Sequence, residues 1–597
     1  MRDNDAEKRS LRSIKAGSPI PDYSSGFGND PSCYEETTVM RPRFATRMLD
    51  GFRRDPNHHI TATGVLGVNG RVFNPDAAAK GTANTKLSRR LKGRHLQMIA
   101  IGGSIGTGLF VASGGALAQG GPATLLICYS LIGCMLYCTV HALGEMAVLF
   151  PVSGSFSAYS TRFLDPAWGF AMGWNYALQW LVVLPLEIIA ASITIDYWNN
   201  KLDHAIFVTI FLFLIISINL AGVKGYGEAE FFFSIVKVVA VIGYIILAII
   251  LNCGGAPDSG YVGGKLWIDP GAFHNGFKGF CSVLVSAAFA FAGTELVGLA
   301  AAETANPRKS LPTAVKQVFW RIALFYVVSL GLVGLLVPYT DPRLLQPGSA
   351  NAAASPFVIS IENAGIEVLP AVMNAVILIS VLSVGNSAVF GSSRTLASLA
   401  DQGQAPRWLS YVDRKGRPLM AIGVSAAVGF LAYTADTQDQ GTILEWMLAL
   451  SGLSSIFTWG SICLCHIRFR RAWKLQGYDV NDLAFTSQPG VIGSWVGFLF
   501  NCLVIVAQFW VGAWPVGWKT LSSSDKTQNW FLGNLAVPVV LLFYISYKLY
   551  YKTSIVRCRD MDLKTGQREL NLGHLLAEER AERAQWPRWK RAYKTVC

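Results

Sequence analysis

A run of small and polar residues interrupts the first long apolar segment of the chain. The sequence GGSIGTG at 102–108 contains four glycines, which predicts a break in a membrane-length helix and unpaired backbone groups at its middle. The N-terminal end of the second half-helix would offer N–H groups and a positive dipole end to a carboxylate. Carbonyls at the end of the first half would suit an ammonium, and Thr107 adds a hydroxyl donor. The run therefore predicts a receptor for a zwitterion.

A plainer interpretation of the same run is close helix packing, because small residues four positions apart let two helices approach each other. Ser104 and Thr107 inside the run, and a second interruption with the sequence FAFAGTE at 289–295, favour a binding site instead. A dinucleotide-binding or P-loop motif is excluded. The run reads GxxGxG, no strand precedes it, no acidic residue follows at the required distance, and no Gly-Lys-Ser/Thr occurs there.

Ionisable residues inside apolar segments are costly, so a functional role is the default expectation. Glu295 follows the second interruption, where it would gate protons or hold the half-helices together. Lys237 would be a buried ammonium that replaces a coupling sodium and releases its proton during the cycle, or it would snorkel to the interface. Glu187 would face the cavity or pair within the bundle. Glu145 would take part in coupling or be solvated at a helix end. The Phe289 ring, next to the second interruption, would close over a ligand.

The elements that position these residues are membrane-length helices. Of 597 residues, 52% are hydrophobic and only 15% are charged, against about 25% charged in soluble proteins. Each of twelve apolar segments is about long enough to cross a 30 Å hydrocarbon core: 96–117, 123–149, 169–193, 204–223, 229–252, 276–301, 317–338, 369–396, 418–434, 442–466, 491–513 and 532–551. Interruptions in the first and sixth segments predict a 5+5 inverted repeat. The expected fold is thus an all-α integral membrane protein with twelve transmembrane helices, broken helices 1 and 6, and two peripheral helices.

The loop charges predict the orientation of the chain. Loops after even-numbered segments carry fifteen Lys and Arg residues, against six in the loops after odd-numbered segments, so the even loops and both termini are expected in the cytosol. We therefore divide the chain into a disordered cytosolic N-terminal tail at 1–87, a twelve-helix domain at 88–552 and a cytosolic C-terminal tail at 553–597. The net charge of +13 lies in tails and alternate loops, so no nucleic-acid partner is expected. No signal peptide is visible in the polar N-terminal region.

The sequence does not favour an intramembrane enzyme. Such an enzyme would need a nucleophile with a base, or a His–Glu metal motif, inside a span. His141 and His466 stand alone, and most cysteines lie in apolar stretches as small buried residues. We expect no catalytic residue, no metal and no cofactor, with the proton as the coupling ion.

Longer motifs surround these residues. Gly121-Pro122 leads through GEM at 144–146 to Pro151, beside GGSIGTGLF at 102–110, FAGTE at 291–295 and ETANPRKSLP at 303–312. Further stretches are QWLVVLPLEI at 179–188, GVKGYGEAEF at 222–231 and LALSGLSSIFTWGSICLCHIRFR at 448–470. From about residue 88 to the C-terminus, the chain resembles the fungal general amino-acid permeases of the yeast amino acid transporter family, in the amino acid–polyamine–organocation superfamily.

The resemblance implies a twelve-helix permease that imports L-amino acids with broad specificity by proton symport at the plasma membrane. Thr107 and Gly108 match the carboxylate-binding turn, Ser104 and Ala292 match carbonyl-donating positions, and Phe289 matches the aromatic gate. Gly106, Gly293 and Thr294 complete the expected substrate-binding set. Glu295 matches the acidic residue after the second break, and Lys237 matches a lysine near a lost sodium site. The gate is Phe here, whereas some bacterial relatives carry Trp, which leaves the gating geometry open.

The resemblance also extends to a regulatory tail at 570–597. It implies ubiquitin-ligase and trafficking partners, with sorting through endosomes or the vacuole, and Lys8 and Lys15 as ubiquitin acceptors. An inert solvated tail is the alternative. The other expected partners are amino acid substrates and membrane lipids. A second class of function is an amino acid sensor with a transporter-like fold, which would signal through its cytosolic tails.

Overall fold

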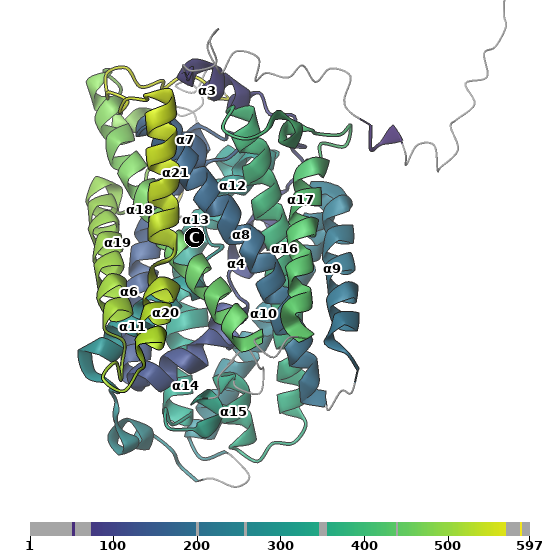
Figure 1. Cartoon of the computed structure of the whole chain (residues 1–597), viewed down its shortest axis with the longest axis vertical. Coiled ribbons are helices and arrows are strands. Elements are labelled where there is room, and N and C mark those ends of the chain that lie inside the picture. Colours follow the sequence, from purple (N-terminus) through teal and green to yellow (C-terminus); the bar gives the residue numbers. More distant parts are fainter. Residues whose placement is uncertain are drawn as a thin grey trace, which may run out of the picture. The chain divides into compact units, whose positions relative to one another are not determined.

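The computed structural model describes residues 50–53, 73–198, 202–255, 260–345, 355–436, 440–568 and 585–587. These residues form helices joined by loops, with an isolated parallel bridge between Leu91 and Thr304 (Figure 1). The prediction of an all-helical membrane protein is confirmed. Lys8, Lys15 and the tail from 570 onward, apart from 585–587, lie outside the described residues.

The first five predicted segments coincide with helices. The first is split into α4 (Gly93–Gly102), α5 (Thr107–Phe110) and the start of α6 (Ala112–Leu149). Helix α6 bends at Gly121, where φ is +80° directly before Pro122, because a glycine tolerates a positive φ that other residues rarely adopt. This bend separates the first two segments. The next three are α8 (Pro166–Thr194), α9 (His204–Leu220) and α10 (Gly222–Asn252), with the short α7 (Phe156–Phe163) before α8.

The second five segments repeat this order. The sixth is again split, into α11 (Gly276–Phe291) and α12 (Leu296–Ala300). The seventh consists of α13 (Pro307–Arg321), a π-helical stretch η5 (Ile322–Val328) and α14 (Ser329–Leu336). Helices α16 (Leu369–Asp401), α17 (Leu419–Gly429) and α18 (Gln440–Leu475) follow, after the short α15 (Pro356–Glu362). Helices α19 (Gly490–Ala513), α20 (Ser523–Asn534) and α21 (Ala536–Tyr551) complete the bundle.

The first four segments pack against their counterparts five positions later. Helix α6 contacts α13 and α14, α8 contacts α16, and α9 contacts α17. The two broken segments also meet, since α4 contacts α12 and α5 contacts α11. These contacts agree with two five-helix repeats that meet at the broken helices. In the view of Figure 1, α19 lies at the left edge of the bundle and α21 runs along its front, as expected for peripheral helices.

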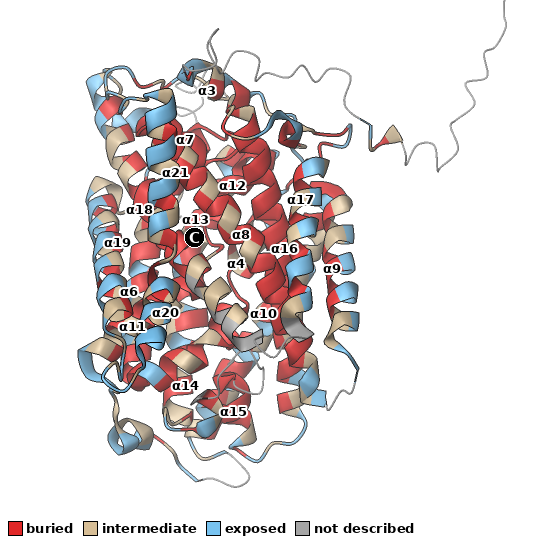
Figure 2. Cartoon of the chain, in the orientation of Figure 1, coloured by how far each residue is buried: buried red, intermediate tan, exposed pale blue. Residues whose placement is uncertain are grey.

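The outer helices are apolar where they are exposed. Phe213 on α9, Phe232 and Val239 on α10, and Leu499 on α19 are all more than half exposed, whereas most residues of α8 and α16 are buried (Figure 2). Such a surface suits lipid. Eight helices among the described residues are long and apolar enough to cross a membrane, and the α20–α21 pair, bent by 56°, makes a ninth. The remaining predicted spans are shorter: α9, the helical stretch Leu419–Thr434, and the broken first segment.

Three details differ from the sequence-based expectations. Part of the expected N-terminal tail forms α3 (Pro75–Ala83), capped by the Asn74 side chain, and Phe73 and Ala78 pack with Tyr547. Part of the expected C-terminal tail, residues 553–568, also packs on the bundle, with Met561 and Leu563 buried in the main core. Three arginines counted as loop charges, Arg162, Arg321 and Arg394, are buried inside helices at 7%, 2% and 2% exposure. Twelve even-loop cations remain against six, so the predicted bias persists.

Candidate functional site

The break in the first span is open backbone between two helix ends. Helix α4 ends at Gly102 and α5 begins at Thr107. Gly106, at the start of α5, is extended, and the first turn closes through the N–H groups of Leu109 and Phe110, which donate to its carbonyl at 3.2 and 3.1 Å. Its position also requires a small residue, because a Cβ on Gly106 would lie 2.4 Å from the Val384 side chain. The predicted break therefore exists at the predicted residues.

The break in the sixth span lies directly against the first. Helix α11 ends at Phe291 and α12 begins at Leu296. Gly293, between them, has φ of +96°, and a Cβ there would lie 2.3 Å from the carbonyl oxygen of Gly103. Gly108 makes a second close approach, since its Cβ would lie 2.4 Å from the Ala290 Cα. The glycines of the two breaks thus let the half-helices touch.

A small cavity of about 20 Å³ lies between the breaks. Predicted residues line most of it, and α8 and α16 contribute the remainder; the lining consists of Ser104, Gly106, Thr107, Gly108, Trp180, Val183, Glu187, Phe289, Ala292 and Val384. That volume is enough for roughly one water molecule. The site is therefore too narrow for a larger ligand, and its lining must move apart before one fits.

Glu187 lies in this cavity, from α8. The Thr107 hydroxyl donates a hydrogen bond to the Glu187 carboxylate, and both side chains are at most 1% exposed. The hydroxyl that was expected to bind a ligand thus donates to a buried acid in this structure. Of the two predictions for Glu187, the cavity-facing one agrees with its position.

Lys237 lies beside the cavity lining rather than in it. Its ammonium donates to the carbonyl oxygen of Gly102 at 2.6 Å and to the Ser383 hydroxyl at 2.8 Å. The Gly102 carbonyl belongs to the last residue of α4, where helix carbonyls have no partner within the helix. The side chain is 0% exposed, so Lys237 does not snorkel to the interface. It binds the end of the first half-helix.

Glu295 supports the break in the sixth span without lining the cavity. Its carboxylate accepts hydrogen bonds from the Tyr176 hydroxyl at 3.2 Å, the Trp459 indole at 3.1 Å and the Gly293 N–H at 3.2 Å. The donors come from α8, α18 and the break itself. Of the two predictions for Glu295, holding the half-helices agrees with these contacts.

Gly293 and Thr294 shape the break without lining the cavity. The Thr294 hydroxyl donates to the Phe291 carbonyl at 2.8 Å and accepts a hydrogen bond from the Arg321 guanidinium. The Tyr326 hydroxyl lies within hydrogen-bond distance of the Ser104 and Ala290 carbonyls, at 3.0 and 2.8 Å, and so ties the two breaks together.

Glu145 belongs to a different cluster. Its carboxylate pairs with Arg470 at 2.7 Å and His466 at 3.1 Å, and accepts the Ser487 N–H at 2.7 Å. The Glu145 side chain is buried at 1% exposure, so the prediction that it is solvated at a helix end is wrong. These contacts join α6, α18 and the loop before α19, and Glu145 does not line the cavity.

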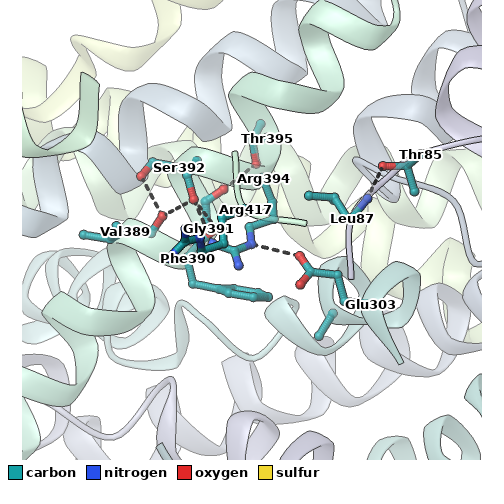
Figure 3. Close-up of polar contacts among 12 residues, drawn as sticks. Thr85, Leu87, Glu303, Val389, Phe390, Gly391, Ser392, Arg394, Thr395 and Arg417 are labelled. Carbon is teal, nitrogen blue, oxygen red and sulfur yellow. Dashed lines mark hydrogen bonds and ion pairs between the residues drawn. The ribbon is translucent and has the colours of Figure 1, made fainter. Parts of the chain in front are cut away.

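A second buried ion pair joins α16 to the end of the sixth segment. The Arg394 Nε donates to Glu303 at 2.9 Å, and its guanidinium stacks over the Phe390 ring at 4.3 Å (Figure 3). Next to Glu303, the Thr304 and Ala302 carbonyls accept hydrogen bonds from Arg568 of the C-terminal segment at 3.1 and 2.9 Å. From the sequence, Arg394 was counted among the loop charges, and this pair was not predicted.

Further site residues were also missed. Trp180, Val183 and Val384 line the cavity, but a cavity-facing side chain in a long apolar helix looks like any other core residue. Glu230 offered a stronger signal. It stands seven residues before Lys237, which is two helical turns, but the predicted start of that segment at 229 left it at a helix end.

The chain matches known proteins over most of its length. A family model described as amino acid permease matches residues 95–560. The chain belongs to the amino acid permease family. It is 58% identical over 557 residues to the general amino-acid permease GAP2 of Candida albicans, covering 92% of this chain and 93% of that protein. It is 54% identical to the general amino-acid permease GAP1 of Saccharomyces cerevisiae, covering 86% and 87%.

Among solved structures, Mhp1 aligns with this permease with a TM-score of 0.43 and 15% identity, covering 79% of this chain and 96% of that chain. Mhp1 is a nucleobase-cation-symport-1 family transporter, in a closed conformation with bromovinylhydantoin bound. The family match and the apolar helices make this chain a multi-pass membrane permease for amino acids.

Proposed function

We propose that this permease imports L-amino acids of many kinds across the plasma membrane by proton symport. The observation that carries the coupling proposal is the Lys237 ammonium bound to the Gly102 carbonyl at the helix break. A protonated lysine is a fixed cation at the end of a half-helix. Its neutral form binds that carbonyl more weakly, because hydrogen bonds to charged groups are stronger. Protonation would therefore control how firmly the first half-helix is held.

The backbone of the substrate would be bound by the two breaks. The N–H groups from Gly106 to Gly108 and the Thr107 hydroxyl would bind the carboxylate, and the carbonyls near Ser104 and Ala292 would bind the ammonium. These groups recognise what all amino acids share. The α8 and α16 residues of the lining would meet the side chain, and Phe289 would cover it. Broad specificity follows if that part of the cavity adapts.

Binding would require the narrow cavity to widen. The cavity holds about 20 Å³, and the Thr107 hydroxyl is taken by Glu187. An arriving carboxylate would compete with Glu187 for that hydroxyl. Protonation of Glu187 would lower the repulsion between the two acids, so that proton and substrate would favour each other. Glu187 is in this way the proposed partner of Lys237 in coupling.

Orientation and regulation are part of the same proposal. The loop charges support cytosolic termini, and the tail lysines would be modified by a ubiquitin ligase that directs sorting. Arg568 supports a regulatory contact from the C-terminal segment, because it caps carbonyls at the end of the sixth segment.

The experiment is uptake of a panel of labelled amino acids in cells that lack their own permeases. We expect accumulation of many amino acids, mutual competition between them, and loss of accumulation when an uncoupler removes the proton gradient. Uptake that is insensitive to the uncoupler would overturn symport. Normal binding without any uptake would overturn transport and favour a sensor.

A further inference from the structure

A second buried charge on α10 faces the same place as Lys237. Glu230 and Lys237 are seven residues apart, so they lie on one face of the helix two turns from each other. Both side chains are 0% exposed. A Cβ added to Gly102 would lie 2.6 Å from the Glu230 Oε1, which places this carboxylate directly against the end of α4, beside the carbonyl that Lys237 binds.

The Ser383 hydroxyl on α16 joins the two charges. It accepts a hydrogen bond from the Lys237 ammonium at 2.8 Å and lies 2.8 and 2.9 Å from the two Glu230 oxygens. Because a carboxylate can only accept, the hydroxyl proton points at Glu230. One hydroxyl that accepts from the cation and donates to the anion is a complete path for a proton between them.

Other polar and charged groups surround this chain of three. The neighbouring Ser234 hydroxyl is already used, since it donates to the Met98 carbonyl on α4 at 3.0 Å. The other titratable or charged groups near the chain are Glu187 on α8, Tyr226 on α10, His95 on α4, and the Arg394–Glu303 pair beyond Tyr226. Glu187 is close enough to attract Lys237, but Ser383 donates to Glu230.

We propose that Glu230 is the internal proton acceptor for Lys237, with Ser383 as the relay. In the transfer, an N–H bond of the ammonium breaks as a new O–H bond forms on Ser383, and the original Ser383 O–H bond breaks as one forms on the Glu230 carboxylate. The products are a neutral amine and a neutral carboxylic acid. Proton number is conserved and no other reactant is needed.

The consequence falls on α4. After the transfer, a neutral amine faces the Gly102 carbonyl, and the attraction that held the half-helix end weakens. The Glu230 acid stands nearer the expected cytosolic end of α10, which begins at Gly222. Release of the proton from Glu230 to that side would complete its passage. This inference rests on the proposed symport through Lys237.

The test compares Ser383→Ala, Ser383→Thr and Glu230→Gln in membrane vesicles, with surface level and counterflow exchange as measures of folding and binding. Ser383→Ala removes only the relay hydroxyl. We expect its proton-driven accumulation to fall by about tenfold or more, with counterflow retained and the pH dependence of uptake flattened. Ser383→Thr keeps a hydroxyl and should restore both, while Glu230→Gln should match Ser383→Ala.

The outcomes distinguish failure of the Ser383–Glu230 relay from failure of symport through Lys237. If Lys237→Gln abolishes accumulation but Ser383→Ala and Glu230→Gln keep a normal pH profile, the relay is wrong and symport through Lys237 stands. If Lys237→Gln itself keeps pH-dependent accumulation, the proposed coupling fails, and the inference fails with it. If Ser383→Ala and Ser383→Thr are equally impaired in counterflow, Ser383 is a packing residue and the relay is wrong.

Discussion

The carbonyl oxygen of Gly103 and the α-carbon of Gly293 are in such close contact that a Cβ on Gly293 would lie 2.3 Å from that oxygen. One residue belongs to the break of the first span and the other to the break of the sixth. Their contact makes two interrupted helices into a single site. Residues on both sides of it line the small cavity.

Gly293→Ala tests this contact. The substitution adds the colliding Cβ and also strains the backbone, because φ is +96° there and non-glycine residues rarely adopt it. We expect transport to be lost even in the fraction that reaches the surface. Gly243→Ala on α10 and Gly115→Ala on α6 are matched controls, since a Cβ at either meets nothing within 4 Å. Normal uptake by Gly293→Ala would show that the two breaks are looser than described.

Thr107→Val tests the hydroxyl donor in the cavity. The variant keeps the shape and loses the bond to Glu187 and the proposed bond to a carboxylate. Hydrogen bonds to charged groups contribute about 1.5–3 kcal/mol, so we expect uptake at low substrate concentration to fall by roughly tenfold or more. Thr107→Ser should retain most of it. Radiolabelled uptake is the measurement, with the exposed Thr209→Val as a control. Equal loss in both Thr107 variants would argue for packing alone.

Val384→Ala tests which residues choose among side chains. Val384 lines the cavity. The substitution removes its two methyl groups and would admit larger substrates. A methylene-sized change in an apolar cavity is worth about 1–3 kcal/mol. The ratio of phenylalanine to glycine uptake should therefore rise several-fold, while backbone recognition is unchanged. Val381→Ala, buried one turn earlier outside the cavity lining, should leave the ratio as it is. The same ratio shift in both variants would contradict the assignment.

Glu145→Gln tests the distinction between structural and coupling acids. Breaking a buried ion pair at one partner costs about 3–5 kcal/mol, so the variant should melt at a lower temperature in detergent. Its pH dependence of uptake should match the unmodified permease. Glu362→Gln is the control, because the Glu362–Arg343 pair is partly exposed and such pairs contribute little. A flattened pH profile in Glu145→Gln would return this acid to the coupling machinery.

The features that could be predicted from the sequence are those that depend on neighbouring residues in the chain. A glycine-rich interruption in an apolar segment leaves backbone groups unpaired, and this predicts a helix break. Both breaks occur where the sequence predicted them. Glu187 and Lys237 were found because charge inside an apolar segment is rare. Their partners were not. Ser383 looks like any small residue of a membrane helix, and its role depends on α16 lying against α10, a contact between segments 146 residues apart.

Helix ends were the weakest part of the prediction. Residues 73–87 and 553–568 are polar enough to suggest solvated tails, but Phe73, Met561 and Leu563 are buried against the bundle. A few apolar anchors in a polar stretch carry no periodicity, so the sequence does not reveal them. The same weakness placed Glu230 at the end of its predicted segment, although α10 begins eight residues earlier, at Gly222.

The most direct test of the account is uptake of a labelled amino acid into vesicles with an imposed pH gradient, in the unmodified permease and in Lys237→Gln. We predict that Lys237→Gln reaches the membrane and supports counterflow, but no longer accumulates substrate in response to the gradient. Lys474→Gln, an exposed lysine on α18, should accumulate normally. Accumulation by Lys237→Gln with an unchanged dependence on the gradient would contradict proton coupling at the first helix break.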